Sequence, residues 1–327
     1  MINKKLFIRA DGNSEIGYGH IIRCLALAEM LSRHFECIFV TRFDHSFLSE
    51  KIKQVCKQYI LIEEENHRTT FFNLLGASDF VLLDNYFFTS EDQQTIKNKG
   101  CKLICIDDLH DKHYYADLVI NHSIGISPDR FSTEKYTQLA LGFEYALLRG
   151  AFRKPINYQT KGNHVFISFG GGDTTDFITR IMTTLLEQKS SFDKIHWVLG
   201  ASNRVDSFSS NWFKNERIVI HEKLDAQEMV RVMDCCSYAI VPASSILIEC
   251  LSRKIKVITG YYVPNQEKLY KNLVDCDFVV GLGDLSKGAE LKEQLIQKMN
   301  LILDWESACH IDFTKVDERI LNLFLNL

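Results

Sequence analysis

The sequence predicts an α/β protein of two domains, each built on a parallel β-sheet that helices cover on both faces. Short apolar runs rich in β-branched residues alternate with helical patterns along the chain, which is typical of buried parallel strands. A strand, a glycine-bearing loop and a helix follow one another in that order twice, at the head of each predicted domain. The length of 327 residues also fits about two domains.

The first domain is expected over residues 1–150. Ligands of parallel sheets gather beyond the carboxyl ends of the strands, and polar residues stand at several such ends here. They are Asp11, Asp84, Asn85, Tyr86, Asp107, Asp108 and Asn121. We expect this group to include ligand contacts, although for any single member a turn-forming role is an equal alternative. The predicted strands are 6–9, 37–40, 59–62, 80–84, 102–108, 118–121 and 140–142, and the predicted helices are 20–33, 47–57 and 91–99.

A polar stretch with proline and glycine, from about 150 to 162, reads as a linker to a second domain over residues 151–327. The final amphipathic stretch, 312–325, is expected to pack back on the first domain. The second domain's predicted strands are 164–169, 195–200, 217–220, 238–242 and 256–260, and its helices are 177–188, 225–234, 246–251, 266–274 and 289–302.

The stretch from Arg9 to Ala28 organises the rest of the chain. Gly17 and Gly19 allow the backbone to approach an anionic ligand at a helix N-terminus. His20 then stands at the start of that helix and can take up a proton near neutral pH. Arg23 occupies the place of the third glycine of a dinucleotide motif, and no triphosphate-binding motif is present, so neither a nicotinamide nor an ATP site is predicted. The alternative is a tight turn in which His20 only caps the helix.

The second strand–loop–helix unit offers a phosphate site. Gly170 to Asp173 present backbone N–H groups beside a helix N-terminus. Ser244 and Ser245 open another helix, and Glu249 lies one turn into it, where it can accept hydrogen bonds from two ribose hydroxyls. The alternatives are an N-cap for Ser244 and an exposed helix acid for Glu249.

Composition excludes several classes of function. The net charge of −4 argues against a nucleic-acid surface. The ten cysteines form no C-x-x-C pair, which favours buried reduced thiols in a cytosolic protein. With no signal-peptide pattern and no bilayer-length apolar run, we expect a soluble, cytoplasmic protein without a membrane partner.

Several blocks resemble the nucleotide-sugar hydrolases of the pseudaminic acid pathway, the PseG family, which are related to GT-B glycosyltransferases such as MurG. The resemblance extends over most of the chain, and its first and last blocks are the most specific. The blocks are Asp11–Arg23, Leu83–Tyr86, Ile106–Asp108, Ala146–Arg149, Phe169–Asp173, Ala243–Ser245 with Glu249, and Asn265–Glu267.

This resemblance implies a GT-B-like fold, with two Rossmann-like domains facing a cleft, and a monomer. The implied reaction is metal-independent and needs no cofactor: water attacks the anomeric carbon of UDP-2,4-diacetamido-2,4,6-trideoxy-β-L-altropyranose and releases UDP. His20 matches the catalytic base. Substrate contacts are expected at Asp11, Gly17, Gly19, Tyr86, Arg149, Asn265 and Gln266, and UDP contacts at Gly171, Gly172, Asp173, Ser244, Ser245 and Glu249. The family has two glycines where this chain has Gly170 to Gly172, which leaves the register of the phosphate contacts open by one residue.

Three other functions compete with hydrolysis. A glycosyltransferase on the same fold would pass the sugar to a hydroxyl acceptor, and Tyr86 to Phe88 could form part of an acceptor surface. A UDP-sugar 2-epimerase would need acid and histidine pairs on several loops, whereas one clear base is present. A non-catalytic nucleotide-sugar sensor would not need His20 and Asn265 together.

Overall fold

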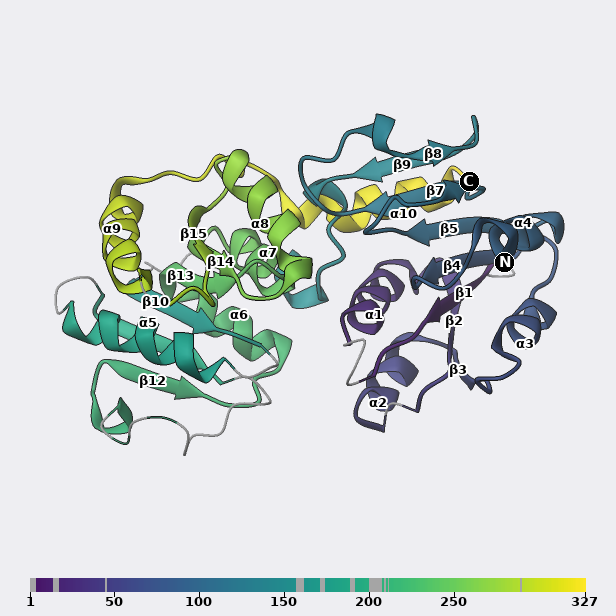
Figure 1. Cartoon of the computed structure of the whole chain (residues 1–327). Helices are drawn as coiled ribbons and strands as arrows, with labels where there is room; N and C mark the ends of the chain where they lie inside the picture. Colours follow the sequence, from purple (N-terminus) through teal and green to yellow (C-terminus); the bar gives the residue numbers. More distant parts are fainter. Residues whose placement is uncertain are drawn as a thin grey trace. The chain divides into compact units, whose positions relative to one another are not determined.

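The computed structural model describes residues 4–13, 18–44, 46–156, 162–170, 174–188, 192–199, 208, 210, 212–288 and 290–327. The chain divides into two compact units (Figure 1). Unit 1 comprises Met1–Arg153 and Phe313–Leu327, and unit 2 comprises Lys154–Asp312.

Unit 1 is built on a seven-stranded sheet with the order β3-β2-β1-β4-β5-β7-β9, in which the neighbouring strands run parallel. A two-stranded ribbon, β6 and β8, lies outside this sheet. The strands are β1 (Lys4–Ala10), β2 (Phe35–Thr41), β3 (Gln58–Leu61), β4 (Phe80–Asp84), β5 (Lys102–Ile106), β6 (His113–Tyr114), β7 (Leu118–Asn121), β8 (Ser132–Thr133) and β9 (Gln138–Leu141). The helices are α1 (Gly19–Leu31), α2 (Ser46–Val55), α3 (His67–Leu74), α4 (Ser90–Asn98) and α10 (Val316–Leu325), with 3₁₀ turns η1 (Pro128–Arg130), η2 (Phe143–Tyr145), η3 (Gly150–Arg153) and η6 (Phe313–Lys315).

The interior strand β1 shows where a site can form in this unit. Its residues from Leu6 to Ala10 are all buried, because strands β2 and β4 flank it and helices cover the sheet. Ala10 pairs with Asp84, the last residue of β4. The carboxyl ends of β1 and β4 therefore meet at the edge of the sheet where α1 begins.

The C-terminal helix α10 packs within unit 1 beside α1. Its Phe324 is fully buried and lies 5.9 Å from Phe35 and 6.5 Å from Phe80, measured between ring centroids. The buried Arg153 forms ion pairs with Glu29 of α1 and Asp317 of α10. Aromatic packing and one buried guanidinium thus hold the end of the chain to unit 1.

Unit 2 repeats the architecture with a six-stranded parallel sheet of order β12-β11-β10-β13-β14-β15. Trp197 of the sheet belongs to the apolar core of this unit, which also includes buried residues of helices α5 and α9. The strands are β10 (Gly162–Ser168), β11 (Lys194–Val198), β12 (Ile218–His221), β13 (Cys236–Pro242), β14 (Lys256–Tyr261) and β15 (Val280–Asp284). The helices are α5 (Thr175–Glu187), α6 (Ala226–Asp234), α7 (Ser245–Ser252), α8 (Pro264–Asp275) and α9 (Leu291–Asp304), with the 3₁₀ turn η5 (Trp212–Lys214).

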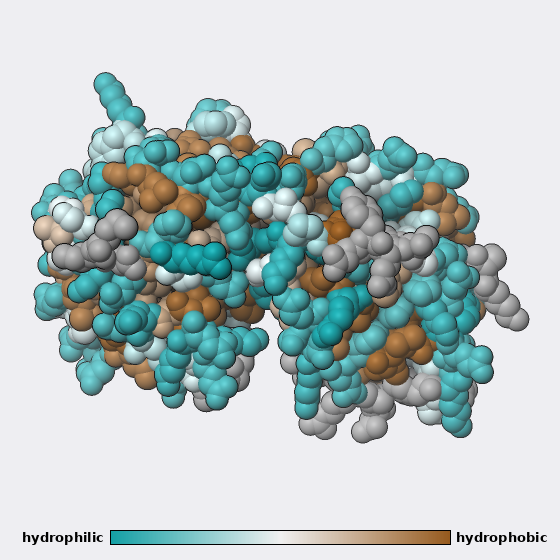
Figure 2. All heavy atoms as spheres, turned by 180° about the vertical axis from the view of Figure 1, so that it is seen from behind, coloured by the Kyte–Doolittle hydropathy of each residue, from teal (hydrophilic) through white to brown (hydrophobic). Residues whose placement is uncertain are grey.

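Polar side chains cover most of the face shown in Figure 2, and apolar residues gather there in small separate groups. Among the described residues, no helix combines the length and the apolar character that a bilayer crossing requires.

Candidate functional site

The strongest cluster of polar side chains lies at the carboxyl edge of the unit 1 sheet, where α1 begins. His20 is in the first turn of α1 and is 8% exposed. Its Nδ1 lies 2.7 Å from Oδ1 of Asp84, the last residue of β4. The fold brings His20 and Asp84 together because β1 and β4 are neighbouring strands and α1 is the first helix after β1.

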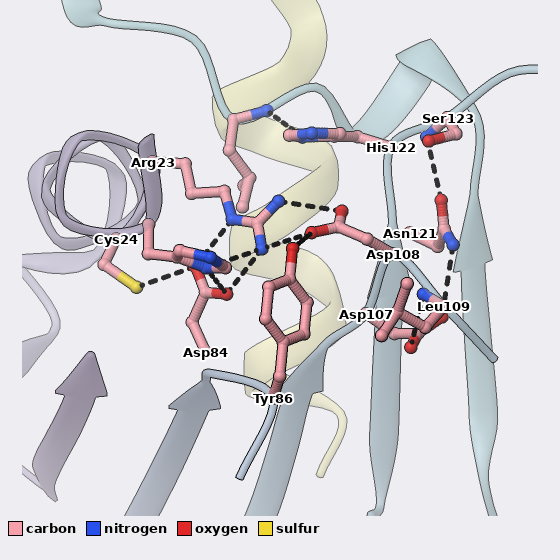
Figure 3. Close-up of polar contacts among 12 residues, drawn as sticks. Arg23, Cys24, Asp84, Tyr86, Asp107, Asp108, Leu109, Asn121, His122 and Ser123 are labelled. Carbon is pink, nitrogen blue, oxygen red and sulfur yellow. Dashed lines mark hydrogen bonds and ion pairs between the residues drawn. The ribbon is translucent and has the colours of Figure 1, made fainter. Parts of the chain in front are cut away.

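Arg23, one turn further along α1, holds two carboxylates at once (Figure 3). Its Nε lies 2.6 Å from Asp84, and its Nη1 and Nη2 each lie 2.8 Å from an oxygen of Asp108. Burial alone would raise the pKa values of both carboxyl groups, but the charge and hydrogen bonds of Arg23 lower them below their usual range. Both aspartates are therefore ionised at neutral pH.

This network settles which nitrogen of His20 carries the proton. Nη2 of Arg23 also lies 3.1 Å from Nδ1 of His20, but its two N–H bonds are directed to the closer oxygens of Asp84, at 2.5 Å, and Asp108, at 2.8 Å. Nδ1 of His20 is therefore left to donate to the Asp84 carboxylate, which can only accept. In the neutral ring Nε2 then keeps its lone pair, which is the form that a general base needs.

Tyr86, which follows β4, completes a closed ring of contacts around His20. Its hydroxyl donates to Asp108 at 3.0 Å, and its ring meets the imidazole of His20 edge-on at 4.9 Å. Burial and the charge of Asp108 raise the pKa of Tyr86, so the phenol stays protonated. Contacts thus run from His20 through Asp84, Arg23, Asp108 and Tyr86 back to His20.

A depression of about 360 Å³ borders this ring, lined in part by Asn85, Tyr86, Phe88, Asp108 and Lys112. That volume includes space open to solvent, and its enclosed part, about 20 Å³, has room for about one water molecule. Among the described residues, no group of three or more His, Cys, Asp or Glu side chains is placed to hold a metal ion.

The other predicted substrate contacts of unit 1 differ in their surroundings. Asp11 is 2% exposed, and its carboxylate accepts hydrogen bonds from Arg9, Thr41 and Arg42, so its own chain engages both oxygens. Arg149 lies over the ring of Phe152 at 4.9 Å.

Of the two glycines predicted to contact the substrate, only Gly19 lies within the described residues. Gly19 is exposed, and the space beside its α-carbon is open, since an added Cβ would meet nothing within 4 Å. Gly17 lies outside the described residues.

In unit 2, Gly171, Gly172 and Asp173 lie outside the described residues. Their sequence-based assignment to phosphate therefore stays a prediction.

The polar residues at the start of α7 are placed in different ways. Ser244 occupies the N-cap of α7, but its side chain makes no capping hydrogen bond. Ser245 is exposed, whereas Glu249 is buried, so the latter is not a solvated helix acid.

The first turn of α8 carries the other two predicted residues of unit 2. Asn265 is exposed there, whereas Gln266 is buried. Oε1 of Gln266 accepts a hydrogen bond from the backbone N–H of Tyr262 at 3.2 Å.

Sequence reasoning left three members of the ring out of its predicted site. Arg23 served to exclude a dinucleotide motif and to end the first resemblance block, without a role in the site, and Asp84 and Asp108 were two among several strand-end acids. His20 and Arg23 are three residues apart and therefore lie on one face of the helix. This spacing could have indicated that both contact the same strand ends.

No protein-family model matches the chain. Among curated proteins, the chain is 25% identical over 303 residues to an uncharacterised protein of Methanocaldococcus jannaschii, covering 87% of this chain and 61% of that protein. The chain thus spans less than two thirds of that relative. It is also 27% identical over 270 residues to a UDP-2,4-diacetamido-2,4,6-trideoxy-β-L-altropyranose hydrolase of Campylobacter jejuni, covering 80% of this chain and 93% of the relative.

Solved structures share the fold at low sequence identity. MurG of Acinetobacter baumannii superimposes with a TM-score of 0.68 at 10% identity, covering 99% of this chain and all of MurG. A UDP-GlcNAc 2-epimerase of Methanocaldococcus jannaschii gives 0.65 at 13% identity, with 99% and 100% covered. The predicted GT-B-like fold of two parallel-sheet domains is confirmed.

Proposed function

We propose that this protein hydrolyses a UDP-linked 2,4-diacetamido-2,4,6-trideoxy sugar and releases UDP and the free sugar for pseudaminic acid biosynthesis. The observation that carries the proposal is the bond between His20 Nδ1 and the ionised Asp84, because it leaves Nε2 as an oriented base. The Campylobacter relative, a hydrolase of such a UDP-sugar, supports the choice of reaction.

In the proposed reaction, Nε2 of His20 takes a proton from water as the water oxygen bonds to the anomeric carbon. The bond from that carbon to the phosphate oxygen breaks, and its electron pair leaves with UDP. With His20 neutral, Arg23 contributes +1 and the two aspartates −2, so the ring carries a net charge of −1. This charge stabilises both the imidazolium and the positive charge that develops on the sugar.

The remaining contacts of the proposal follow the sequence predictions. Arg149, Asn265 and Gln266 are assigned to the sugar or the diphosphate, and the UDP moiety to Ser244, Ser245 and Glu249. Two observations support these roles. The side chain of Ser244 makes no capping hydrogen bond, and Glu249 is buried rather than solvated. Asp11 is better suited to joining the ends of β1 and β2, because its oxygens already bind Arg9, Thr41 and Arg42.

A glycosyltransferase is the second candidate, and the likeness to MurG favours it. The base of such an enzyme would deprotonate an acceptor hydroxyl instead of water. The two candidates share His20, Asp84 and the UDP contacts, so they differ only in what attacks the anomeric carbon.

The deciding experiment incubates purified protein with UDP-2,4-diacetamido-2,4,6-trideoxy-β-L-altropyranose in oxygen-18 water, with no acceptor. Hydrolysis by the proposed route gives free sugar labelled at the anomeric oxygen and unlabelled UDP. The sugar is read early, before its anomeric oxygen exchanges with solvent. Intact substrate with normal UDP binding would reject hydrolysis in favour of transfer.

Replacing the base tests the role of His20. His20→Asn is expected to lower kcat by about 10²- to 10⁴-fold while the Kd for UDP stays unchanged. His34→Asn is the matched control, since His34 is exposed just beyond the end of α1. Equal kcat values for His20→Asn and the wild type would rule out the proposed base.

A further inference from the structure

A second histidine stands at the same edge of the unit 1 sheet. His122 directly follows β7, and Figure 3 shows it beside Arg23 and Asp108. Its Nδ1 accepts a hydrogen bond from the backbone N–H of Leu147 at 3.3 Å. No described residue forms a hydrogen bond with its Nε2. Because Nε2 is also not one of the fully buried polar atoms without a partner, it is accessible to a ligand or to solvent.

The partner of Nδ1 fixes the tautomer of this ring. A backbone amide can only donate, so Nδ1 of His122 must present its lone pair, and the single proton of the neutral ring lies on Nε2. His20 has the opposite arrangement, because its Nδ1 faces a carboxylate. The two histidines therefore present different chemistry at Nε2: His20 accepts a proton there, and His122 donates a hydrogen bond.

His122 also stays neutral across the physiological range. Protonation would set a second N–H against the N–H of Leu147. Burial, together with the charge of Arg23, lowers the pKa of His122 to about 4, although Asp108 and Asp84 act in the opposite direction. The imidazole is therefore a fixed neutral donor at pH 7.

The charge next to His122 indicates what kind of acceptor it meets. By formal charge, Arg23 contributes +1 and Asp84 and Asp108 together −2, so the neighbouring ring of contacts carries a net charge of −1. That charge repels a diphosphate and leaves a neutral oxygen as the better partner for the Nε2–H group. The acetamido carbonyl groups of the substrate in the proposed function are such oxygens.

Resting on that proposed function, we propose that Nε2–H of His122 donates a hydrogen bond to an acetamido carbonyl of the sugar and so selects N-acylated substrates. This role goes beyond the base, the sugar contacts and the UDP contacts assigned above, and it makes His122 a specificity residue. The group that it recognises is an amide oxygen at C2 or C4 of the sugar.

Two replacements of His122 test the contributions of its two ring nitrogens separately. His122→Asn keeps an acceptor for the Leu147 N–H and removes the donor at the position of Nε2. His122→Gln places an amide N–H near the position of Nε2. We measure kcat/KM of both variants on the diacetamido substrate and on two analogues in which a hydroxyl replaces the acetamido group at C2 or at C4.

On the diacetamido substrate, the Asn variant is expected to lose about 10-fold in kcat/KM, the effect of one hydrogen bond, and the Gln variant to regain part of it. On the analogue that lacks the recognised carbonyl, the wild type and the Asn variant are expected to have equal kcat/KM values. The Kd for UDP should be the same for all three proteins. The same loss on both analogues, no loss on any substrate, or a weaker affinity for UDP would overturn the assignment.

The same comparison works without turnover. If the wild type leaves the substrate intact in water, the proposed hydrolysis fails, and the Kd values of the intact UDP-sugars are compared by calorimetry instead. A donor effect confined to one acetamido group in those Kd values supports the role of His122 even then. Equal Kd values for the wild type and the Asn variant on all three compounds would reject it.

Discussion

Arg23 and Asp108 form a two-pronged ion pair, with Nη1 and Nη2 of the guanidinium each 2.8 Å from a different carboxylate oxygen. The Nε edge of the same guanidinium is bound to Asp84. One arginine thereby fixes the carboxylate behind His20 and the carboxylate that binds Tyr86. Because the bonds to Arg23 hold both acids ionised, the orientation of His20 depends on Arg23 as well as on Asp84.

Replacing Asp84 by asparagine tests this dependence. The amide keeps the size of the side chain but offers His20 a neutral partner, so the ring can adopt the tautomer with a proton on Nε2. We expect kcat to fall by roughly 10²- to 10⁴-fold with little change in the Kd for UDP. Steady-state kinetics and calorimetry measure the two quantities.

Asp129→Asn, at an exposed position in η1, is the matched control and should leave kcat unchanged. An Asp84→Asn variant with full kcat would show that His20 needs no carboxylate behind it.

Removing the cation of the ring leaves Asp84 and Asp108 without a counter-charge. Arg23→Met is therefore expected to lower the free energy of unfolding at pH 7 by about 3–5 kcal/mol. In the wild type the pKa values of both acids are lowered, so their stabilising effect holds above pH 3.8 and is lost below it. In the variant these pKa values rise, so its deficit should shrink as the pH falls from 7 towards 4.

Urea unfolding at pH 7 and pH 4.5 provides the comparison, with the exposed Arg33→Met as control. A deficit of the same size at both pH values would mean that lost packing, rather than unpaired charge, destabilises the variant.

The C-terminal helix supplies a core residue to unit 1. Phe324 is fully buried against Phe35 and Phe80, so Phe324→Ala should cost about 3–5 kcal/mol of unfolding free energy. Its neighbour Leu325 is 54% exposed, and Leu325→Ala should change stability by less than about 0.5 kcal/mol. Similar unfolding midpoints in urea for the two variants would contradict the packing of α10.

Three histidines lie on adjacent strands of unit 2. We expect them to make the free energy of unfolding fall in acid. His196 lies between His221, at 3.1 Å from its Nδ1, and His164, at 3.3 Å from its Nε2. Partial burial, then the neighbouring His221, His164 and Lys194, lower the pKa of His196 to about 4. The unfolded chain binds this proton more readily, so the stabilising effect is present above pH 6.5 and is lost as the pH falls towards 4.

After allowance for solvent screening, the loss from His196 amounts to roughly 1 kcal/mol. His196→Gln should therefore show a shallower fall in unfolding free energy between pH 6.5 and pH 4 than the wild type. Parallel curves for the two proteins, measured by urea unfolding, would exclude this histidine as a source of acid sensitivity.

The amino-acid pattern alone determined most of the fold. The buried run at 80–84 coincides with β4, because a short apolar segment has few alternatives to a central parallel strand. Strand β15 and helix α3 were not predicted. Two glycines interrupt the apolar pattern of β15, and α3 shows no sustained helical periodicity, so neither carries a strong local signal.

The site divides in the same way between local and tertiary information. The sequence placed His20 at a helix start and acids at strand ends, because both features are local. It could not distinguish Asp107 from Asp108, which are adjacent in the chain. The tertiary structure decides this: Asp107 binds Tyr114, Asn121 and two backbone N–H groups, whereas Asp108 turns to Arg23 and Tyr86. Successive residues at a strand end point to opposite sides, so only the packing of α1 above the sheet selects which carboxylate joins His20.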